Sequence, residues 1–196
     1  FNYAFNNNGN NFISSSFKLN NSWIESSNNP STVEFRFKSN ELTPTNVSQS
    51  IFSIYNDTTL VSDLILEYTG SGLTSASYSG ATLDPNYQYA TLKWIPNVTA
   101  GNSANIVFPF FNKDWWSIMI TSGSINGFEL TTANKIYNGD TGTSIGYINS
   151  SFINTGSWAQ STDAFFTTSS SQTAFSGSLQ EIRYYNTILS KDSFKD

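Results

Sequence analysis

Apolar and charged residues alternate most regularly in one short segment of the N-terminal half. The run Val33-Glu34-Phe35-Arg36-Phe37-Lys38 places an apolar side chain at every second position. A period of two is typical of a β-strand that has one buried and one solvent-facing side. We therefore predict a strand here, with its valine and two phenylalanines in the core.

Short apolar runs recur along the rest of the chain and are separated by clusters of Asn, Gly, Ser and Pro. No repeat with a period of 20 to 50 residues is present, which argues against a solenoid or a propeller. Short strands divided by turn residues favour a β-sandwich or barrel over alternating β and α units. The further predicted strands are Phe12–Leu19, Ser50–Tyr55, Leu60–Tyr68, Gln88–Ile95, Ala104–Phe111, Trp115–Thr121, Gly127–Leu130 and Gly177–Tyr185.

The predicted strand Gln88–Ile95 has two unequal faces. Leu92 and Trp94 alternate on one face, and Tyr87 and Tyr89 alternate on the other. We expect the first pair in the core and the two tyrosines on the surface.

The predicted strand Trp115–Thr121 carries two adjacent tryptophans. The same alternation buries Trp116, Ile118 and Ile120 and turns Trp115 and Met119 outward. This prediction holds only where the strand contains no bulge, because an extra residue exchanges the two faces.

The region from Thr141 to Thr173 is the most polar of the chain, although it contains Trp158. We predict long loops there, around one or two anchored strands. A turn of helix is expected only after Ser190, whose side chain is a suitable N-cap.

Composition supports a single all-β domain. The chain has 196 residues, of which 38% are hydrophobic and 16% aromatic, so it can bury a sizeable core. We expect residues 1–196 to form one domain, and a start at Phe1 rather than Met suggests a piece of a larger protein. No apolar run approaches the roughly 20 residues of a membrane-spanning helix.

The charge balance narrows the range of partners. Nine Lys and Arg residues stand against fourteen Asp and Glu residues, which gives a formal charge of −5. Because no basic cluster is present, we expect the protein to bind neither nucleic acid nor an anionic membrane surface. We also expect no insertion into a membrane. The remaining candidate partners are glycans and neighbouring protein subunits.

Two segments resemble landmarks of laminin-G-like domains, within the concanavalin A-like lectin and glucanase superfamily. Trp116–Thr121 is similar to a strand of that family that begins with Trp and alternates aliphatic residues. Phe175–Ser190, with the sequence FSGSLQEIRYYNTILS, resembles the closing strand, and Ser31–Lys38 resembles an early strand. The resemblance implies an antiparallel β-sandwich of the jelly-roll type.

The closing segment also suggests a structural framework. Gly177 would allow a close approach of the backbone, and Glu181 and Arg183 would pair neighbouring strands, with Tyr185 completing the set. The family has an acidic pair where this chain has Gln180-Glu181. That departure weakens any inference of a cation site there.

The sequence lacks the usual catalytic groups. It contains neither histidine nor cysteine, which excludes Ser-His and Cys-His nucleophile systems and the usual zinc sites. A glycosidase or lyase would need two carboxylates across a cleft, yet Glu34, Glu67, Glu129 and Glu181 are each the only glutamate of a predicted strand. We predict that the protein is not an enzyme.

Outward aromatics are the candidates for ligand binding, because sugars stack on aromatic faces. These candidates are Tyr87, Tyr89, Trp115 and Trp158, and packing within the sandwich is the more common role for each. Apart from calcium, no cofactor is expected.

Calcium is a second possibility, and it would require oxygen ligands that converge. The candidates are Asn138 and Asp140, with Asp57 and Asp63. Asn138-Gly139-Asp140 is first of all a typical tight turn.

The expectation for function is a non-catalytic binding or adhesion module, displayed on an extracellular or virion-surface protein. The alternatives are a purely structural domain of a capsid, fibre or surface assembly, and a glycosidase or lyase.

Overall fold

The computed structural model describes residues 5–8, 31–41, 48–68, 89–123, 127–138, 142–153, 163–166, 172–185 and 187–190. Several predicted features lie outside these residues: the strand Phe12–Leu19, the helical turn after Ser190, and the side chains of Tyr87, Asp140 and Trp158. No helix occurs in the described part of the chain, and so none of these residues forms an apolar helix that could cross a membrane.

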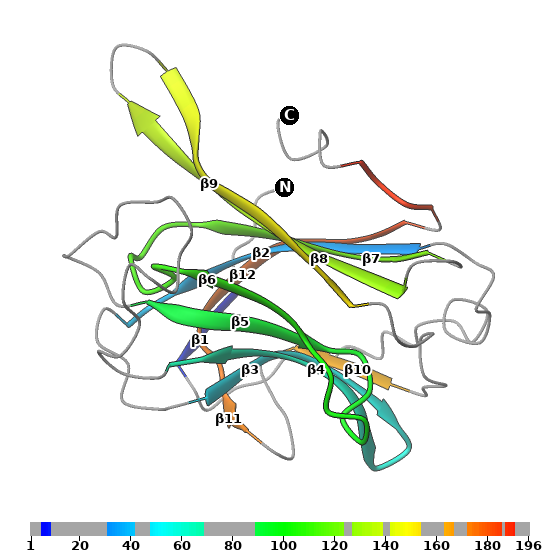
Figure 1. The fold of residues 1–196 in the computed structure, drawn as a ribbon. Coiled ribbons are helices and arrows are strands. Elements are labelled where there is room, and N and C mark those ends of the chain that lie inside the picture. Colours follow the sequence, from blue (N-terminus) through cyan, green and yellow to red (C-terminus); the bar gives the residue numbers. More distant parts are fainter. Residues whose placement is uncertain are drawn as a thin grey trace.

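Two β-sheets face each other and form a jelly-roll sandwich (Figure 1), which confirms the predicted all-β fold. Sheet A has the strand order β1-β12-β2-β7-β8-β9, and sheet B has the order β10-β3-β4-β5-β6. All these neighbours are antiparallel, and only the short β11 runs parallel to its partner β3. The strands are β1 Phe5–Asn8, β2 Ser31–Ser39, β3 Ser48–Asn56, β4 Thr59–Glu67, β5 Ala90–Ile95, β6 Ala104–Phe108, β7 Trp116–Gly123, β8 Gly127–Asn138, β9 Gly142–Ile153, β10 Asp163–Phe166, β11 Thr173–Ala174 and β12 Ser176–Tyr185.

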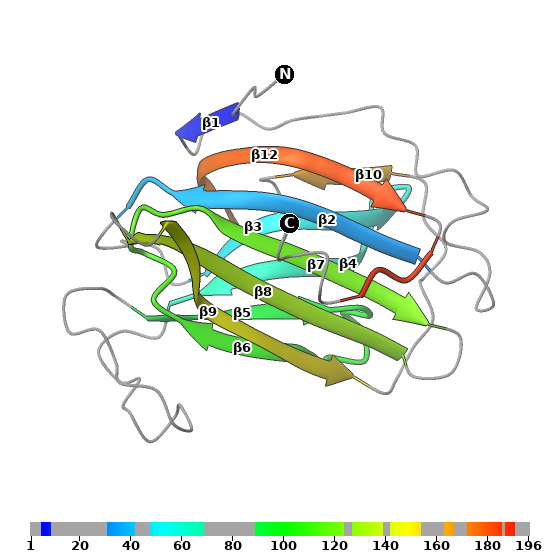
Figure 2. The same ribbon diagram turned by 90° about the horizontal axis from the view of Figure 1, so that it is seen from above.

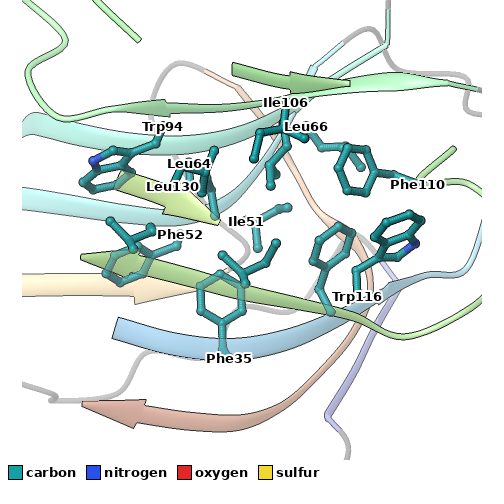
Figure 3. Close-up of a cluster of buried hydrophobic side chains, with 14 of the residues drawn as sticks. Phe35, Ile51, Phe52, Leu64, Leu66, Trp94, Ile106, Phe110, Trp116 and Leu130 are labelled. Atoms are coloured by element: carbon teal, nitrogen blue, oxygen red, sulfur yellow. The ribbon is translucent and has the colours of Figure 1, made fainter. Parts of the chain in front are cut away.

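The core lies between the two sheets and is rich in aromatic rings (Figure 3). Trp116 of sheet A lies 5.5 Å from Phe108 and 4.7 Å from Phe110, measured between ring centroids. Trp94 of sheet B stacks on Phe52 at 6.3 Å. Both tryptophans are fully buried. Since burial of one large apolar side chain contributes about 1.5–3 kcal/mol, this aromatic layer accounts for a large part of the folding free energy.

The predicted alternation in β2 is confirmed. Val33, Phe35 and Phe37 are buried, and the charged residues between them are partly exposed. In β5 and β7 the inward prediction is also confirmed for Leu92, Trp94, Trp116, Ile118 and Ile120.

The described part of the polar region after Thr141 contains β9 and β10, in agreement with the one or two strands predicted there. β9 is a strand of 12 residues, and β8 continues to Asn138 instead of ending at Leu130. The two strands pair along their whole length. Because backbone hydrogen bonds supply that pairing, a strand rich in Ser, Thr and Asn can form beside a partner although its local pattern favours a loop.

The sandwich closes on one side between β9 and β6. The backbone N–H of Asn105 in β6 donates to Oγ of Ser151 in β9 at 3.0 Å. A side chain thus satisfies an edge-strand donor. On the other side of sheet A, β1 pairs with β12 only from Ser176 to Leu179, and the described residues add no strand beside the rest of β12.

Candidate functional site

The closing strand β12 contains a bulge opposite Phe35 of β2. Gln180 pairs with Arg36 and Arg183 pairs with Glu34, so that Glu181 and Ile182 together face one residue of β2. Glu181 has φ +55°, in the left-handed region that side chains rarely adopt. Such an extra residue turns a strand and redirects its side chains.

The bulge brings four charged side chains together on the outer face of sheet A. Arg36 lies 3.8 Å from Glu181, and Arg183 lies 3.8 Å from Glu34 and 3.5 Å from Glu181. Glu181 and Arg183 of β12 thus contact Arg36 and Glu34 of the neighbouring strand β2. Since these side chains keep 17–50% of their surface exposed, each pair stabilises the fold by about 0–1 kcal/mol.

Trp115 adjoins these charges at the start of β7. Its ring lies beneath the Arg36 guanidinium, 5.9 Å from ring centroid to Cζ, and its side chain is partly exposed. Asn134 Nδ2 donates to the Trp115 carbonyl oxygen at 3.2 Å and so fixes the backbone of Trp115. The prediction that Trp115 points outward is confirmed. We call Glu34, Arg36, Trp115, Glu181 and Arg183 the outer-face cluster.

The C-terminal segment Thr187–Ser190 passes over another part of the same face (Figure 2, red). The Thr32 hydroxyl donates to the Thr187 carbonyl at 2.7 Å and accepts from the Leu189 N–H at 3.1 Å. Leu189 packs on Met119 and Ala133. Met119 therefore lies on the outer face, as predicted, but is only 1% exposed, because Leu189 covers it.

The aromatic candidates have different outcomes. Tyr89 is only 7% exposed, so the prediction that it lies on the surface was wrong. It immediately precedes β5, where the alternation of that strand no longer governs its exposure. Tyr87 and Trp158 lie outside the described residues. Only Trp115 is placed beside other groups that could contact a ligand.

Sequence reasoning missed two residues of the outer face. Arg36 was predicted as a solvent-facing strand residue, and its position over Trp115 depends on the pairing of β2 with β7. Phe152 of β9 is 59% exposed. Alternation within residues 142–153 could have identified Phe152 only after that region was recognised as a strand.

Of the calcium candidates, Asp140 and the side chain of Asn138 lie outside the described residues. Asp57 lies in the exposed turn between β3 and β4, and Asn138 ends β8 in the other sheet (Figure 1). Asp63 is 2% exposed and accepts hydrogen bonds from Ser50 at 2.6 Å and Ser53 at 2.9 Å. No group of three or more acidic residues suited to a metal ion occurs within the described residues.

Gly177 has the framework role that the sequence predicted. A Cβ atom there would lie 2.3 Å from the Phe175 ring and 2.4 Å from the Lys38 carbonyl oxygen. Only glycine allows this approach between β12 and β2. Tyr185, the last framework residue, pairs with Thr32 at the end of the same ladder.

Tyr184 marks the open edge of β12. β1 pairs with β12 only from Ser176 to Leu179, so nothing in the described residues continues sheet A beyond β12 at Tyr184. The side chain is 36% exposed, and its partial burial raises the pKa of the phenol above its ordinary value.

The cluster combines three kinds of contact. Its carboxylates accept hydrogen bonds, its guanidinium groups donate them, and its indole offers an apolar surface. Sugars need this combination, because each ring carries hydroxyl groups around C–H faces. The two carboxylates are bridged by Arg183 and are not opposed across a cleft, which is unlike the arrangement that glycoside hydrolysis requires.

Comparisons with known proteins support the fold. No protein-family model matches the sequence, and no curated protein sequence matches it. The CBM40 domain of the Ruminococcus gnavus IT-sialidase matches with a TM-score of 0.54 and 12% identity, over 98% of this chain and 93% of that chain.

Two further structures match smaller shares of larger chains. A leech intramolecular trans-sialidase, complexed with 2,7-anhydro-Neu5Ac, has a TM-score of 0.53 and 12% identity, over 98% of this chain and 26% of that chain. A heptameric SAP-like pentraxin from Limulus polyphemus has a TM-score of 0.50 and 13% identity, over 83% of this chain and 66% of that chain. At these identities the likeness shows the fold alone, which is a jelly-roll sandwich of the concanavalin A-like kind.

Proposed function

We propose that this chain is a non-catalytic recognition module that binds glycan on the outer face of sheet A. The observation that carries the proposal is the outer-face cluster, where Trp115 lies beside paired hydrogen-bond donors and acceptors on a part of the sheet that stays accessible. The matched CBM40 is a carbohydrate-binding module, and the matched leech enzyme was solved with a sugar derivative, which supports the same class of ligand.

We further propose that the module is a laminin-G-like domain. The laminin-G-like landmarks at Trp116–Thr121 and Phe175–Ser190 support membership of that family. We place the module on an extracellular or virion-surface protein, as one domain of a larger chain, where a glycan-binding sandwich would serve adhesion.

Binding is proposed to need no metal ion. The acidic candidates Asp57 and Asp63 occupy different parts of the β3–β4 hairpin, and the buried Asp63 is already bonded to two serines. Measurement of glycan binding in EDTA and in calcium chloride tests this point. Equal binding is expected, and loss of binding in EDTA would show that a calcium site is needed.

A glycan array followed by isothermal titration calorimetry tests the proposal. The whole chain should bind at least one oligosaccharide, and the Trp115→Ala variant should lose roughly tenfold or more in affinity, since a stacked aromatic contributes about 1–3 kcal/mol. Phe152→Ala, an exposed aromatic on the far strand β9, is the matched control and should bind as the parent does. Absence of binding to every glycan, or hydrolysis of a bound glycan, would contradict the proposal.

A protein partner is the second candidate. It is favoured by exposed apolar side chains in β12 and in the segment that follows it, where Ile182, Tyr184 and Ile188 are 37%, 36% and 50% exposed. A structural domain of an assembly would bury these residues against neighbouring subunits. Light scattering over a range of protein concentrations tests self-association. A monomer at all concentrations would exclude an assembly of identical subunits.

A further inference from the structure

We infer that the outer-face cluster selects neutral, hydroxyl-rich oligosaccharides and discriminates against acidic ones. This inference rests on the proposed glycan-binding function and names its class of substrate. The observation behind it is the distribution of charge over the cluster.

The charges of the cluster are already compensated. Glu34 contacts Arg183, Glu181 contacts both Arg36 and Arg183, and all three contacts measure 3.5–3.8 Å. Two carboxylates and two guanidinium groups therefore form one connected and formally neutral network.

An acidic sugar would meet this network unfavourably. Its carboxylate could reach a guanidinium group only beside, or in place of, Glu34 or Glu181. Like charges at such distances repel, most strongly where water is partly excluded. The formal charge of −5 on the whole chain acts in the same direction.

A neutral sugar would meet no such conflict. A hydroxyl group donates and accepts at once, so adjacent hydroxyls can bridge a carboxylate and a guanidinium group without separating them. Trp115 would receive the C–H face of the ring on its accessible part. Arg36 lies over the indole and also contacts Glu181, so it connects the aromatic surface with the charged network.

The first experiment compares sugars that differ in one charge. The probes are pairs of a neutral oligosaccharide and its sialylated counterpart, such as lactose and 3′-sialyllactose, measured with the whole chain by array and calorimetry. We expect the neutral member of each bound pair to bind about threefold or more tightly, with affinity changing less than about twofold between low and high salt.

The outcomes of this comparison separate the two proposals. Tighter binding of the sialylated members would overturn the inference and leave glycan recognition standing. No binding of any member would overturn the proposed function itself.

The second experiment removes the compensation. The double variant Glu34→Gln with Glu181→Gln keeps the shape of both side chains but leaves Arg36 and Arg183 without carboxylate partners. We expect the ratio of sialylated to neutral affinity to rise about threefold to tenfold. Glu67→Gln is the matched control, because it breaks the ion pair with Lys93 on sheet B. An unchanged ratio in the folded double variant would overturn the inference.

Discussion

Two neighbouring tryptophans at the start of β7 lie in opposite environments: Trp115 immediately precedes the strand, and Trp116 is its first residue. Trp116 points into the core, is fully buried, and donates its indole N–H to Asn112 Oδ1 at 3.0 Å. Trp115 points to the outer face, lies under a guanidinium group and keeps part of its surface accessible. One step along the strand separates a residue that stabilises the sandwich from one that can act on its surface.

The same contrast divides the two faces of sheet A. The inner face is apolar and is covered by sheet B, whereas the outer face is charged in one part and covered by Thr187–Ser190 in another. The inner face therefore carries the stability of the domain, and the charged part of the outer face is where we propose that ligand binds. The following changes test this division.

The largest effect is expected for Trp116→Ala. Removal of this side chain leaves a cavity among Phe108 and Phe110, and the free energy of unfolding should fall by about 3–5 kcal/mol. Trp115→Ala should change it by less than about 1 kcal/mol. Urea denaturation of both variants measures the difference, and equal losses would contradict the division between the two faces.

Met119→Ala probes the covered part of the outer face. Although Met119 points outward, it is buried under Leu189, so truncation should lower the free energy of unfolding by about 2 kcal/mol. The Leu189→Ala variant should remove part of the same contact, and the double variant should lose less than the sum of the two. Full additivity in chemical denaturation would show that the two residues do not pack together.

Glu34→Gln should have a smaller effect. It removes one partly exposed contact with Arg183, so the loss of stability should stay below about 1 kcal/mol and should shrink at high salt. Thermal unfolding at low and high salt measures both effects. A loss as large as that of Met119→Ala would mean that the charged network is part of the stabilising structure.

Tyr184→Phe is expected to change how stability depends on pH above about pH 10. Burial raises the folded-state pKa of this phenol above the ordinary value of about 10, so its contribution to stability is complete below about pH 10 and declines as the pH rises through the folded-state pKa. The variant should therefore lose stability less steeply than the parent above about pH 10. Identical slopes, measured by urea denaturation between pH 9 and 11, would contradict this assignment.

The sequence predicted those parts of the fold where local pattern and final environment agree. Phe35 and Trp116 follow a two-residue period because one side of each strand meets the opposite sheet. Tyr89 and Met119 are buried although the alternation places them away from the core. For Met119 the cause is Leu189, which lies 70 positions later in the sequence and covers it.

By itself the sequence determined the all-β class, the inward faces of β2, β5 and β7, and the absence of histidine and cysteine chemistry. Only the tertiary structure decided where the surface groups meet. The bulge at Glu181 sets the position of Arg183 against Glu34, and the pairing of β2 with β7 sets Arg36 over Trp115. The physical reason is that alternation is a property of one strand, whereas strand register and coverage of a face arise only when separate strands pack together.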